Sequence, residues 1–264
     1  MDIHLLIIDP QNDFCSADGS LSVTGADEDM KRLSSFIEAN GKKMDIHVTM
    51  DTHHLFDIAH PIFWMDGDGN EPKPFTIITE DDVKDGKWRA KNPVFQKTAL
   101  EYVQKLTAND RYPLCIWPPH CLIGTPGHNI FEDVMEALLN WEGSFGTVDY
   151  VTKGSNMFTE HYSAVMADVE DSADPTTALN TRLIDILEKA DMVFVAGEAS
   201  SHCVANTMTD IIDNFGEDSA KKVTLLTDCM SPVPGFEALA DNFFDDMKKR
   251  GVKLEKSTDV LGGA

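Results

Sequence analysis

Residues 192–204 read MVFVAGEASSHCV, and this stretch decides the fold. The apolar, β-branched run over residues 192–196 predicts a buried strand, and Gly197 marks the turn that follows it. A helix is predicted over residues 201–215, with Cys203 close to its start. A strand, a tight turn and a helix in this order indicate one unit of an α/β sheet.

The same alternation continues along the chain. Further strands are predicted over residues 5–8, 45–50, 148–152, 223–226 and 252–255, and helices over residues 27–39, 94–106, 174–189 and 238–250. This order predicts a three-layer α/β/α fold with a central parallel sheet, formed by residues 1–264 as a single domain. Residues 62–113 interrupt the alternation with glycines, prolines and an acidic run. This insertion forms a lid over a site, a subunit contact in a homo-oligomer, or a surface elaboration without function.

Composition limits the classes of partner. The 264 residues include 22 Lys and Arg against 45 Asp and Glu, a formal charge of −23. Such an acidic chain is unsuited to nucleic acid or to an anionic membrane surface, but it can bind a small uncharged molecule. We find no apolar run of about 20 residues and no basic start of a signal peptide. The odd cysteine count without a CxxC pair favours reduced thiols and a cytoplasmic location.

Four reactive side chains follow predicted strand ends. Asp9, Asp51 and Lys153 each come directly after such a strand, and Cys203 follows the turn at Gly197. Parallel strands bring their carboxyl ends to one edge of the sheet, where ligands bind. A thiol at a helix start can be a nucleophile, with a carboxylate as its base and an ammonium to hold charge. Taken separately, these residues have simpler explanations. Cys203 could be a buried apolar thiol, Asp9 a turn residue and Lys153 a surface lysine.

Histidines near the second strand suggest a metal site. Asp51 and His53 form a D-x-H triplet, His60 follows it, and His120 lies in the sequence WPPHC. One carboxylate with two or three imidazoles can bind Zn²⁺, Fe²⁺ or Mn²⁺. The alternative for His60 is an exposed polar residue. We assign no ligand role to the remaining candidates, which are His4, His47, His128 and His161.

Five motifs occur in an order that is typical of one family. They are IIDPQNDFC at 7–15 with GSL at 19–21, DTH at 51–53, WPPHC at 117–121 with GTPG at 124–127, KG at 153–154 with YSA at 162–164, and GEASSHCV at 197–204. Together they resemble the nicotinamidases (pyrazinamidase-type) of the isochorismatase-like cysteine hydrolase superfamily. The similarity covers nearly the whole chain outside residues 62–113, and it implies the isochorismatase-like hydrolase fold.

The resemblance implies catalytic roles for particular residues. Cys203 would be the nucleophile, Asp9 would take its proton and later act as acid and base, and Lys153 would hold charge beside both. The backbone N–H groups of Ala199 and Cys203 would form the oxyanion hole, and a cis peptide would precede Ala199. The implied reaction is the hydrolysis of nicotinamide to nicotinate and ammonia through a thioester on Cys203, a step of NAD salvage in pyridine nucleotide biosynthesis.

The resemblance also implies a cofactor and a substrate pocket. One divalent metal ion, Zn²⁺ or else Fe²⁺ or Mn²⁺, would be bound by Asp51, His53 and His120, with His60 as an additional ligand. The side chains that would contact the pyridine ring are Phe14, Trp117 and Tyr162.

The chain departs from the family pattern at several positions. Glu198 stands before Ala199, where the family usually has an apolar residue, and Val165 replaces the usual Phe after YSA. Two alternatives therefore stay open beside the nicotinamidase interpretation. The first is a related cysteine hydrolase acting on another amide or carbamoyl group, and the second is a catalytically silent ligand-binding relative. Isochorismatases proper lack the cysteine and the metal-binding set, so they fit this chain less well.

Overall fold

A parallel sheet of six strands forms the centre of the protein, as a computed structural model of residues 1–109, 111–216 and 218–260 shows. The strand order is β10-β9-β8-β1-β2-β7. The strands comprise β1 (Ile3–Ile8), β2 (Asp45–Asp51), β7 (Asp149–Lys153), β8 (Met192–Gly197), β9 (Val223–Leu226) and β10 (Lys253–Glu255). All residues of β1 are buried, as a strand covered on both faces requires.

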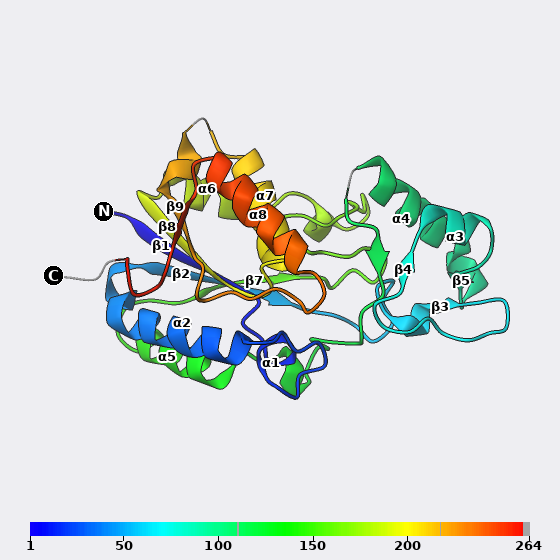
Figure 1. Ribbon diagram of the computed structural model, residues 1–264, viewed down its shortest axis with the longest axis horizontal. Helices are drawn as coiled ribbons and strands as arrows, with labels where there is room; N and C mark the ends of the chain where they lie inside the picture. Colours follow the sequence, from blue (N-terminus) through cyan, green and yellow to red (C-terminus); the bar gives the residue numbers. More distant parts are fainter. Residues whose placement is uncertain (110, 217, 261–264) are drawn as a thin grey trace.

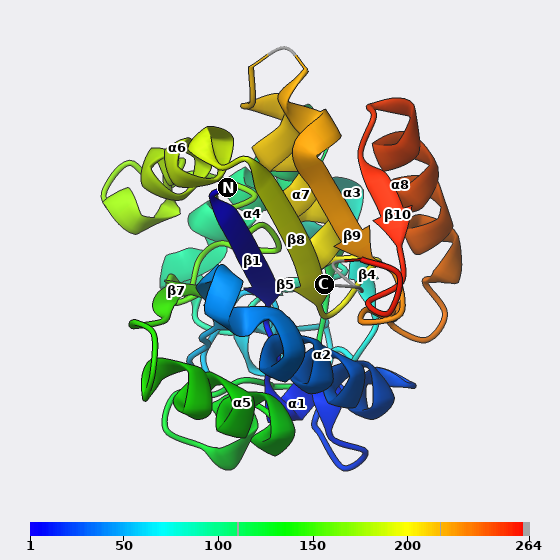
Figure 2. The same cartoon turned by 90° about the vertical axis from the view of Figure 1, so that its left-hand side faces the viewer.

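Helices cover both faces of this sheet. Figures 1 and 2 show α2 (Ala26–Asn40) and α5 (Glu132–Glu142) against one face, and α6 (Thr181–Lys189), α7 (Cys203–Asp213) and α8 (Glu237–Lys249) against the other. The predicted three-layer fold is confirmed. Within the described residues, every helix is too short or too polar to cross a membrane.

The strand register decides which side chains meet at the carboxyl edge. β1 lies between β8 and β2, and Ile8 pairs with Gly197. Asp51 on β2 pairs directly with Lys153 on β7. Asp9 follows Ile8 with a φ of 44°, a left-handed turn that ends the strand. Carboxylates and an ammonium from three neighbouring strands therefore lie together.

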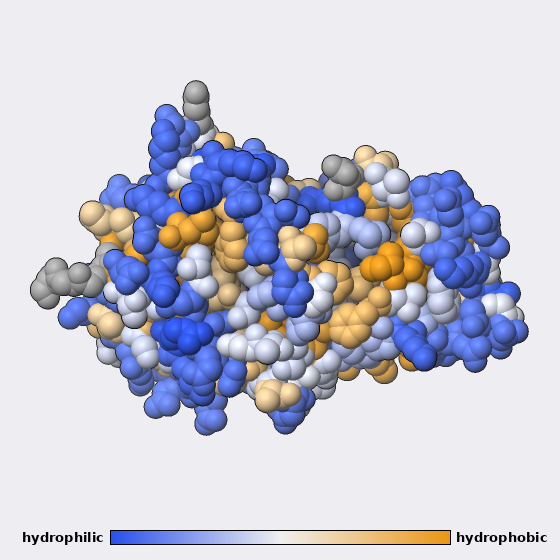
Figure 3. All heavy atoms as spheres, in the orientation of Figure 1, coloured by the Kyte–Doolittle hydropathy of each residue, from blue (hydrophilic) through white to orange (hydrophobic). Residues whose placement is uncertain are grey.

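The insertion forms a lobe beyond the sheet (Figure 1). Its described residues include the helices α3 (Glu80–Lys84) and α4 (Gln96–Ala108) and an antiparallel pair, β3 (Trp64–Met65) with β5 (Arg89–Ala90). Its strand β4 (Ile77–Ile78) pairs antiparallel with β6 (Leu114–Cys115), which directly follows the insertion. Figure 3 shows hydrophobic residues gathered where this lobe meets the body of the protein. The lobe therefore joins the body through an apolar junction.

Three helix predictions need correction. The segment 174–189 is not one helix, because the backbone N–H of Asn180 donates to the Val165 carbonyl and leaves the helical path. A 3-10 turn at Pro175–Thr177 precedes it, and α6 begins after Asn180, whose side chain caps it. The helix predicted at 94–106 begins at Gln96 after another 3-10 turn, and the one at 201–215 spans Cys203–Asp213.

Two helices of the body were missed by the sequence analysis. Helix α1 (Asn12–Cys15) is a single turn, too short for any periodicity to indicate it. The missed α5 buries Val134, Ala137, Leu138 and Trp141, which are spaced as one helical face. This pattern was present in the sequence, so α5 could have been predicted.

One buried carboxyl makes the stability of the fold depend on pH. Burial raises the pKa of Asp168 to about 8, with a further contribution from Glu160. The unfolded chain has a pKa near 3.9 for this group. The folded protein therefore holds one more proton between these values, and stability falls as the pH rises, by up to about 1.4 kcal/mol per pH unit.

We expect Asp168→Asn to remove this pH dependence, because the amide cannot ionise. The difference in melting temperature, variant minus wild type, should therefore increase from pH 5 to pH 8. Thermal unfolding at several pH values measures it, with the exposed Asp241→Asn as the control substitution. A difference that stays constant across this range would contradict a neutral Asp168.

Candidate active site

The turn after β8 presents Cys203 and two backbone donors. Gly197 has a φ of 113°, and the Glu198–Ala199 peptide is cis, as the resemblance implied. The Ala199 carbonyl accepts from the N–H groups of His202 and Val204. The N–H groups of Ala199 and Cys203 donate to no acceptor within the described residues. Two free donors thus lie at the start of α7, where the helix dipole also favours negative charge.

Lys153 connects the thiol with two carboxylates. Its Nζ lies 3.6 Å from the Cys203 Sγ, 3.0 Å from Asp9 Oδ2 and 2.9 Å from Asp51 Oδ1. The hydroxyl of Thr49 donates to the other oxygen of Asp9. All of these side chains are buried, so the ion pairs are shielded from water.

Burial and charge determine the proton positions in this group. Burial raises the pKa of the Cys203 thiol well above its ordinary value, although Lys153 opposes the shift. Burial also raises the pKa of Asp9, again against Lys153. Burial would lower the pKa of Lys153, but Asp51 and Asp9 outweigh it and raise that pKa well above its usual range. A protonated thiol therefore faces a carboxyl group that can accept its proton, next to a permanent ammonium.

A second group of side chains faces the Asp51 carboxylate from the opposite direction. His53 Nε2 lies 3.1 Å and His120 Nε2 3.3 Å from Asp51 Oδ2. His53 Nδ1 contacts Asp57 Oδ2 at 3.0 Å, and His120 Nδ1 contacts the Pro118 carbonyl at 2.9 Å. A carbonyl can only accept, so the His120 Nδ1 carries a proton and its Nε2 is the ring atom that faces Asp51.

These donor atoms fit a divalent metal ion. Burial would lower the pKa of His53, but Asp51 and Asp57 outweigh it and raise that pKa well above its ordinary value, so positive charge is favoured among these carboxylates. A divalent cation would supply that charge in place of the ring proton. The three ligand atoms of Asp51, His53 and His120 lie within 4.8 Å of one another. Their outer nitrogens are held by Asp57 and by a carbonyl, the usual outer partners of a metal-binding histidine. One carboxylate with two imidazoles suits Zn²⁺.

His60 lies beside this set, with its Nε2 available as a metal ligand. Its ring centroid is 5.3 Å from that of His53 and 5.6 Å from that of His120. Its Nδ1 donates to the Leu55 carbonyl, and its buried Nε2 has no partner within the described residues. Burial lowers the pKa of His60 to about 4, so the ring is neutral and Nε2 offers a lone pair.

Aromatic side chains enclose a narrow pocket in front of Cys203. Phe14, Trp117, Tyr162 and Ala199 line it together with Asp51 and His120. The Trp117 indole donates to the Tyr162 hydroxyl at 2.9 Å, which fixes both rings. The sequence-predicted residues of the catalytic, metal and substrate groups, namely Asp9, Phe14, Asp51, His53, His60, Trp117, His120, Lys153, Tyr162, Ala199 and Cys203, thus lie in one region of the structure.

Several residues of this site were missed by the sequence analysis. Glu160 and His202 line the pocket, and Glu160 Oε1 lies 3.9 Å from His53 Nε2. Asp57 holds the outer nitrogen of His53, and Thr49 holds Asp9. A signal existed for His202, which adjoins the nucleophile, and for Glu160, which lies between the KG and YSA motifs. None existed for Asp57 or Thr49, because only the folded chain brings them to their partners.

The insertion reaches this pocket with two aromatic side chains. Tyr112 lies 6.0 Å from the Tyr162 ring and 5.6 Å from the His202 ring, measured between centroids. Phe75 packs edge-on against Trp117 at 5.7 Å. Residues that line the pocket are therefore supported by the lobe.

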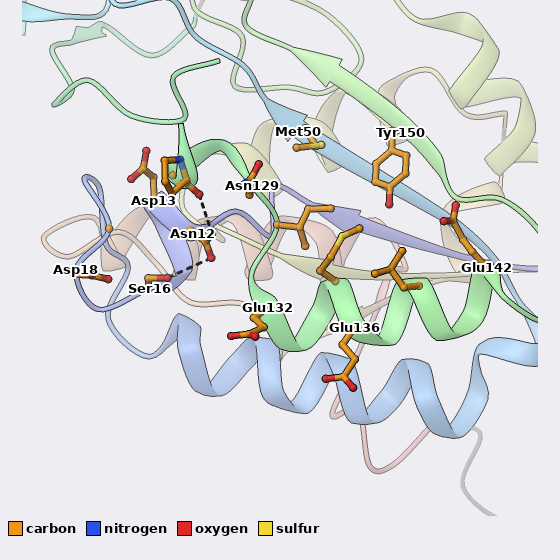
Figure 4. Close-up of a pocket in the computed structure, with 16 residues that line it drawn as sticks. Asn12, Asp13, Ser16, Asp18, Met50, Asn129, Glu132, Glu136, Glu142 and Tyr150 are labelled. Atoms are coloured by element: carbon orange, nitrogen blue, oxygen red, sulfur yellow. Dashed lines mark hydrogen bonds between the residues drawn. The ribbon is translucent and has the colours of Figure 1, made fainter. Parts of the chain in front are cut away.

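A larger groove elsewhere has no comparable chemistry. It has a volume of about 1170 Å³ and lies along α5, with Asp18, Glu132, Glu136 and Glu142 among its lining residues (Figure 4). Its lining contains no cysteine, histidine or lysine. Among the described residues the groove offers neither a thiol nor imidazole ligands, so we place the candidate active site in the smaller pocket.

Sequence comparison finds two nicotinamidases among proteins similar to this chain. The nicotinamidase of Saccharomyces cerevisiae is 22% identical over 253 residues, which cover 95% of this chain and 97% of that protein. The nicotinamidase/pyrazinamidase of Mycobacterium tuberculosis is 24% identical over 211 residues, covering 80% and 78%. No family model matches the chain.

Solved structures of the same kind share the fold. An Acinetobacter nicotinamidase superposes with a TM-score of 0.68 at 22% identity, covering 98% of both chains. A pyrazinamidase of Pyrococcus horikoshii in complex with zinc gives 0.58 at 19% identity, covering 97% and 99%. An L. infantum protein in complex with nicotinate gives 0.61 at 21%, covering 97% and 93%. The resemblance indicated by the five motifs is thereby confirmed.

The turn before Cys203 requires a glycine at position 197. A Cβ there would overlap the backbone of Ile8, and the φ of 113° disfavours any side chain. We expect Gly197→Ala to lower the free energy of unfolding by roughly 3 kcal/mol or more. Gly235→Ala is the matched control, because Gly235 has a φ of 88° but open space around it. It should cost about 1–2 kcal/mol, and equal losses in denaturant unfolding would contradict the close approach to β1.

Proposed function

We propose that this chain is a metal-dependent cysteine amidase that hydrolyses nicotinamide to nicotinate and ammonia. The observation that supports this most is one buried cluster in which Lys153 contacts the Cys203 thiol, Asp9 and Asp51, while Asp51 also belongs to a possible metal-ligand set. The similar proteins named as nicotinamidases, and the similar fold solved with nicotinate, agree with it.

The pocket would orient the substrate by its ring. Nicotinamide is a flat, uncharged amide, and Phe14 and Trp117 offer aromatic faces and edges to it. Asp51, His53 and His120 would hold the metal, with His60 as the additional ligand and Zn²⁺ as the ion. When bound, the metal supplies a Lewis acid for the pyridine nitrogen and so anchors the ring. The carboxamide carbon would then be held next to the Cys203 thiol, which is catalysis by proximity.

The residues around Cys203 would carry the chemical steps. Asp9 takes the thiol proton, and the thiolate forms a bond to the carboxamide carbon. The oxyanion so formed is held by the N–H groups of Ala199 and Cys203. Asp9 returns the proton to the amine, the C–N bond breaks and ammonia leaves a thioester. Asp9 then takes a proton from water, which attacks the thioester carbon. The C–S bond breaks, Cys203 recovers that proton from Asp9, and the product acid releases its carboxyl proton to solvent as nicotinate.

We also propose roles for the lobe and for the cell compartment. The packing of Tyr112 and Phe75 on pocket residues favours a lid over the alternatives of a subunit contact or a surface elaboration. All five cysteines are free, which suits a reducing cytoplasm. There the reaction would serve NAD salvage.

Two other functions remain candidates. A related hydrolase of another amide or carbamoyl group would share the Cys203 chemistry but would not need the imidazoles. A silent ligand-binding relative would not need Asp9, Lys153 and Cys203 together. Ammonia release from nicotinamide that stops on chelation and returns with Zn²⁺ favours the first proposal over both.

The nucleophile is tested by Cys203→Ala. We expect kcat for ammonia release to fall by roughly 10⁴-fold or more, because no other group can form the thioester. Cys115→Ala removes another buried thiol outside the pocket and should leave kcat unchanged. The circular dichroism spectra of both variants should match the wild type. Turnover in a folded Cys203→Ala variant would overturn the mechanism.

The metal site is tested by measuring bound metal per chain. Asp51→Asn should lose the metal and raise KM steeply, because the neutral amide no longer balances the cation. Asp57→Asn should keep the ligands but weaken metal affinity roughly 10–100-fold, since it only orients His53. Wild-type metal content in Asp51→Asn, measured by elemental analysis after dialysis, would refute the ligand assignment.

A further inference from the structure

Glu198 lies in the turn between β8 and α7, next to the Ala199 N–H that is a proposed oxyanion donor. It joins Gly197 to Ala199 through the cis peptide and has no exposed surface. Its position next to the Ala199 N–H connects it with the reaction proposed above.

The side chain of Glu198 reaches two other segments. Its Oε2 accepts from the backbone N–H of Ser231 at 3.0 Å. The Ser231 hydroxyl donates to Asp29 Oδ2 at 2.5 Å, and the Ser231 carbonyl accepts from the N–H of Ser200. Glu198 also lies in hydrogen-bond contact with the Asp29 carboxyl group of α2. The turn is therefore tied to α2 and to the loop at Ser231 through one cluster.

The charges around this cluster allow one anion only. Two carboxylates in contact do not ionise together in a buried site. The Arg32 guanidinium contacts the other oxygen of Asp29 at 2.5 Å, so the one cation of the cluster pairs with Asp29 and not with Glu198. Burial raises the pKa of Glu198 well above its ordinary value, and Asp29 raises it further. Cys15 is the other titratable group nearby, and burial and Glu198 keep it a neutral thiol.

We propose that Glu198 is a positioning residue that works as a neutral carboxylic acid. Its O–H donates to the Asp29 carboxylate while Oε2 accepts from Ser231, so both oxygens are used. The Oε1 atom, which has no other partner within the described residues, carries this proton. The cluster thus fixes the Ala199 N–H and Cys203 against α2 and the Ser231 loop. The catalytic part of this inference rests on the proposed function.

Loss of this proton would push the cluster apart. Two adjacent, buried anions would then share the partly exposed Arg32 cation. The turn between β8 and α7 would move, and with it the two N–H donors. The folded state holds this proton to a higher pH than the unfolded chain does, so its stabilising contribution decreases as the pH rises. Both stability and kcat therefore decline on the alkaline side.

Glu198→Gln tests the charge state of this side chain. The amide keeps an acceptor for Ser231 and a donor for Asp29 but cannot ionise. We expect the kcat of this variant to stay within about 3-fold of the wild-type value at pH 7. Its melting temperature should fall less than that of the wild type between pH 7 and pH 9. Glu237→Gln, an exposed glutamate at the start of α8, is the matched control. An unchanged pH dependence of the melting temperature in Glu198→Gln would overturn the neutral acid.

Glu198→Leu tests the positioning role, because it removes both hydrogen bonds and keeps the volume. We expect kcat for nicotinamide to fall at least 10-fold with KM within about 3-fold, since the oxyanion donors act in the transition state. A wild-type kcat in this variant would overturn the positioning role. If the wild type releases no ammonia, the proposed function fails. The melting-temperature comparison still decides whether Glu198 is neutral, because it needs no substrate.

Discussion

The buried ammonium of Lys153 is the interaction on which the site depends. It lies 3.0 Å from Asp9 and 2.9 Å from Asp51, so a single cation joins the group around the thiol to the group of histidines. A buried charge without partners would cost several kcal/mol, and here both carboxylates compensate it. The fold provides this contact directly, because Lys153 and Asp51 are paired residues of adjacent strands and Asp9 follows the strand on the other side.

The same arrangement explains why the turn at Gly197 is so constrained. β8 is the neighbour of β1, and its end must bring Cys203 within reach of Lys153 and Asp9 without a side chain at position 197. The thiol is then too buried to ionise by itself, as the raised pKa of Cys203 shows. The proposed thiolate chemistry therefore needs a neighbouring base, and Asp9 is the carboxyl group in contact with the thiol.

The sequence predicted the parts of the site that follow from strand ends. Asp9, Asp51 and Lys153 could be grouped because parallel strands end at one edge, and the fold class followed from the same alternation. Asp57 could not be placed, because it belongs to an irregular loop whose path no period describes. The break at Asn180 escaped prediction for a related reason: the contact with Val165 that ends the helical path is formed only in the folded chain.

The charge balance of the pocket follows the change from substrate to product. The proposed substrate is neutral, so it can enter a pocket lined by Asp51 and Glu160 without repulsion. The proposed product is an anion, and the ammonium of Lys153 is already paired with two carboxylates. Negative charge near the turn therefore favours product release but opposes the oxyanion at the Ala199 N–H. A neutral Glu198, as proposed above, serves the oxyanion, because it ties the turn to α2 without adding a second anion beside the oxyanion donors.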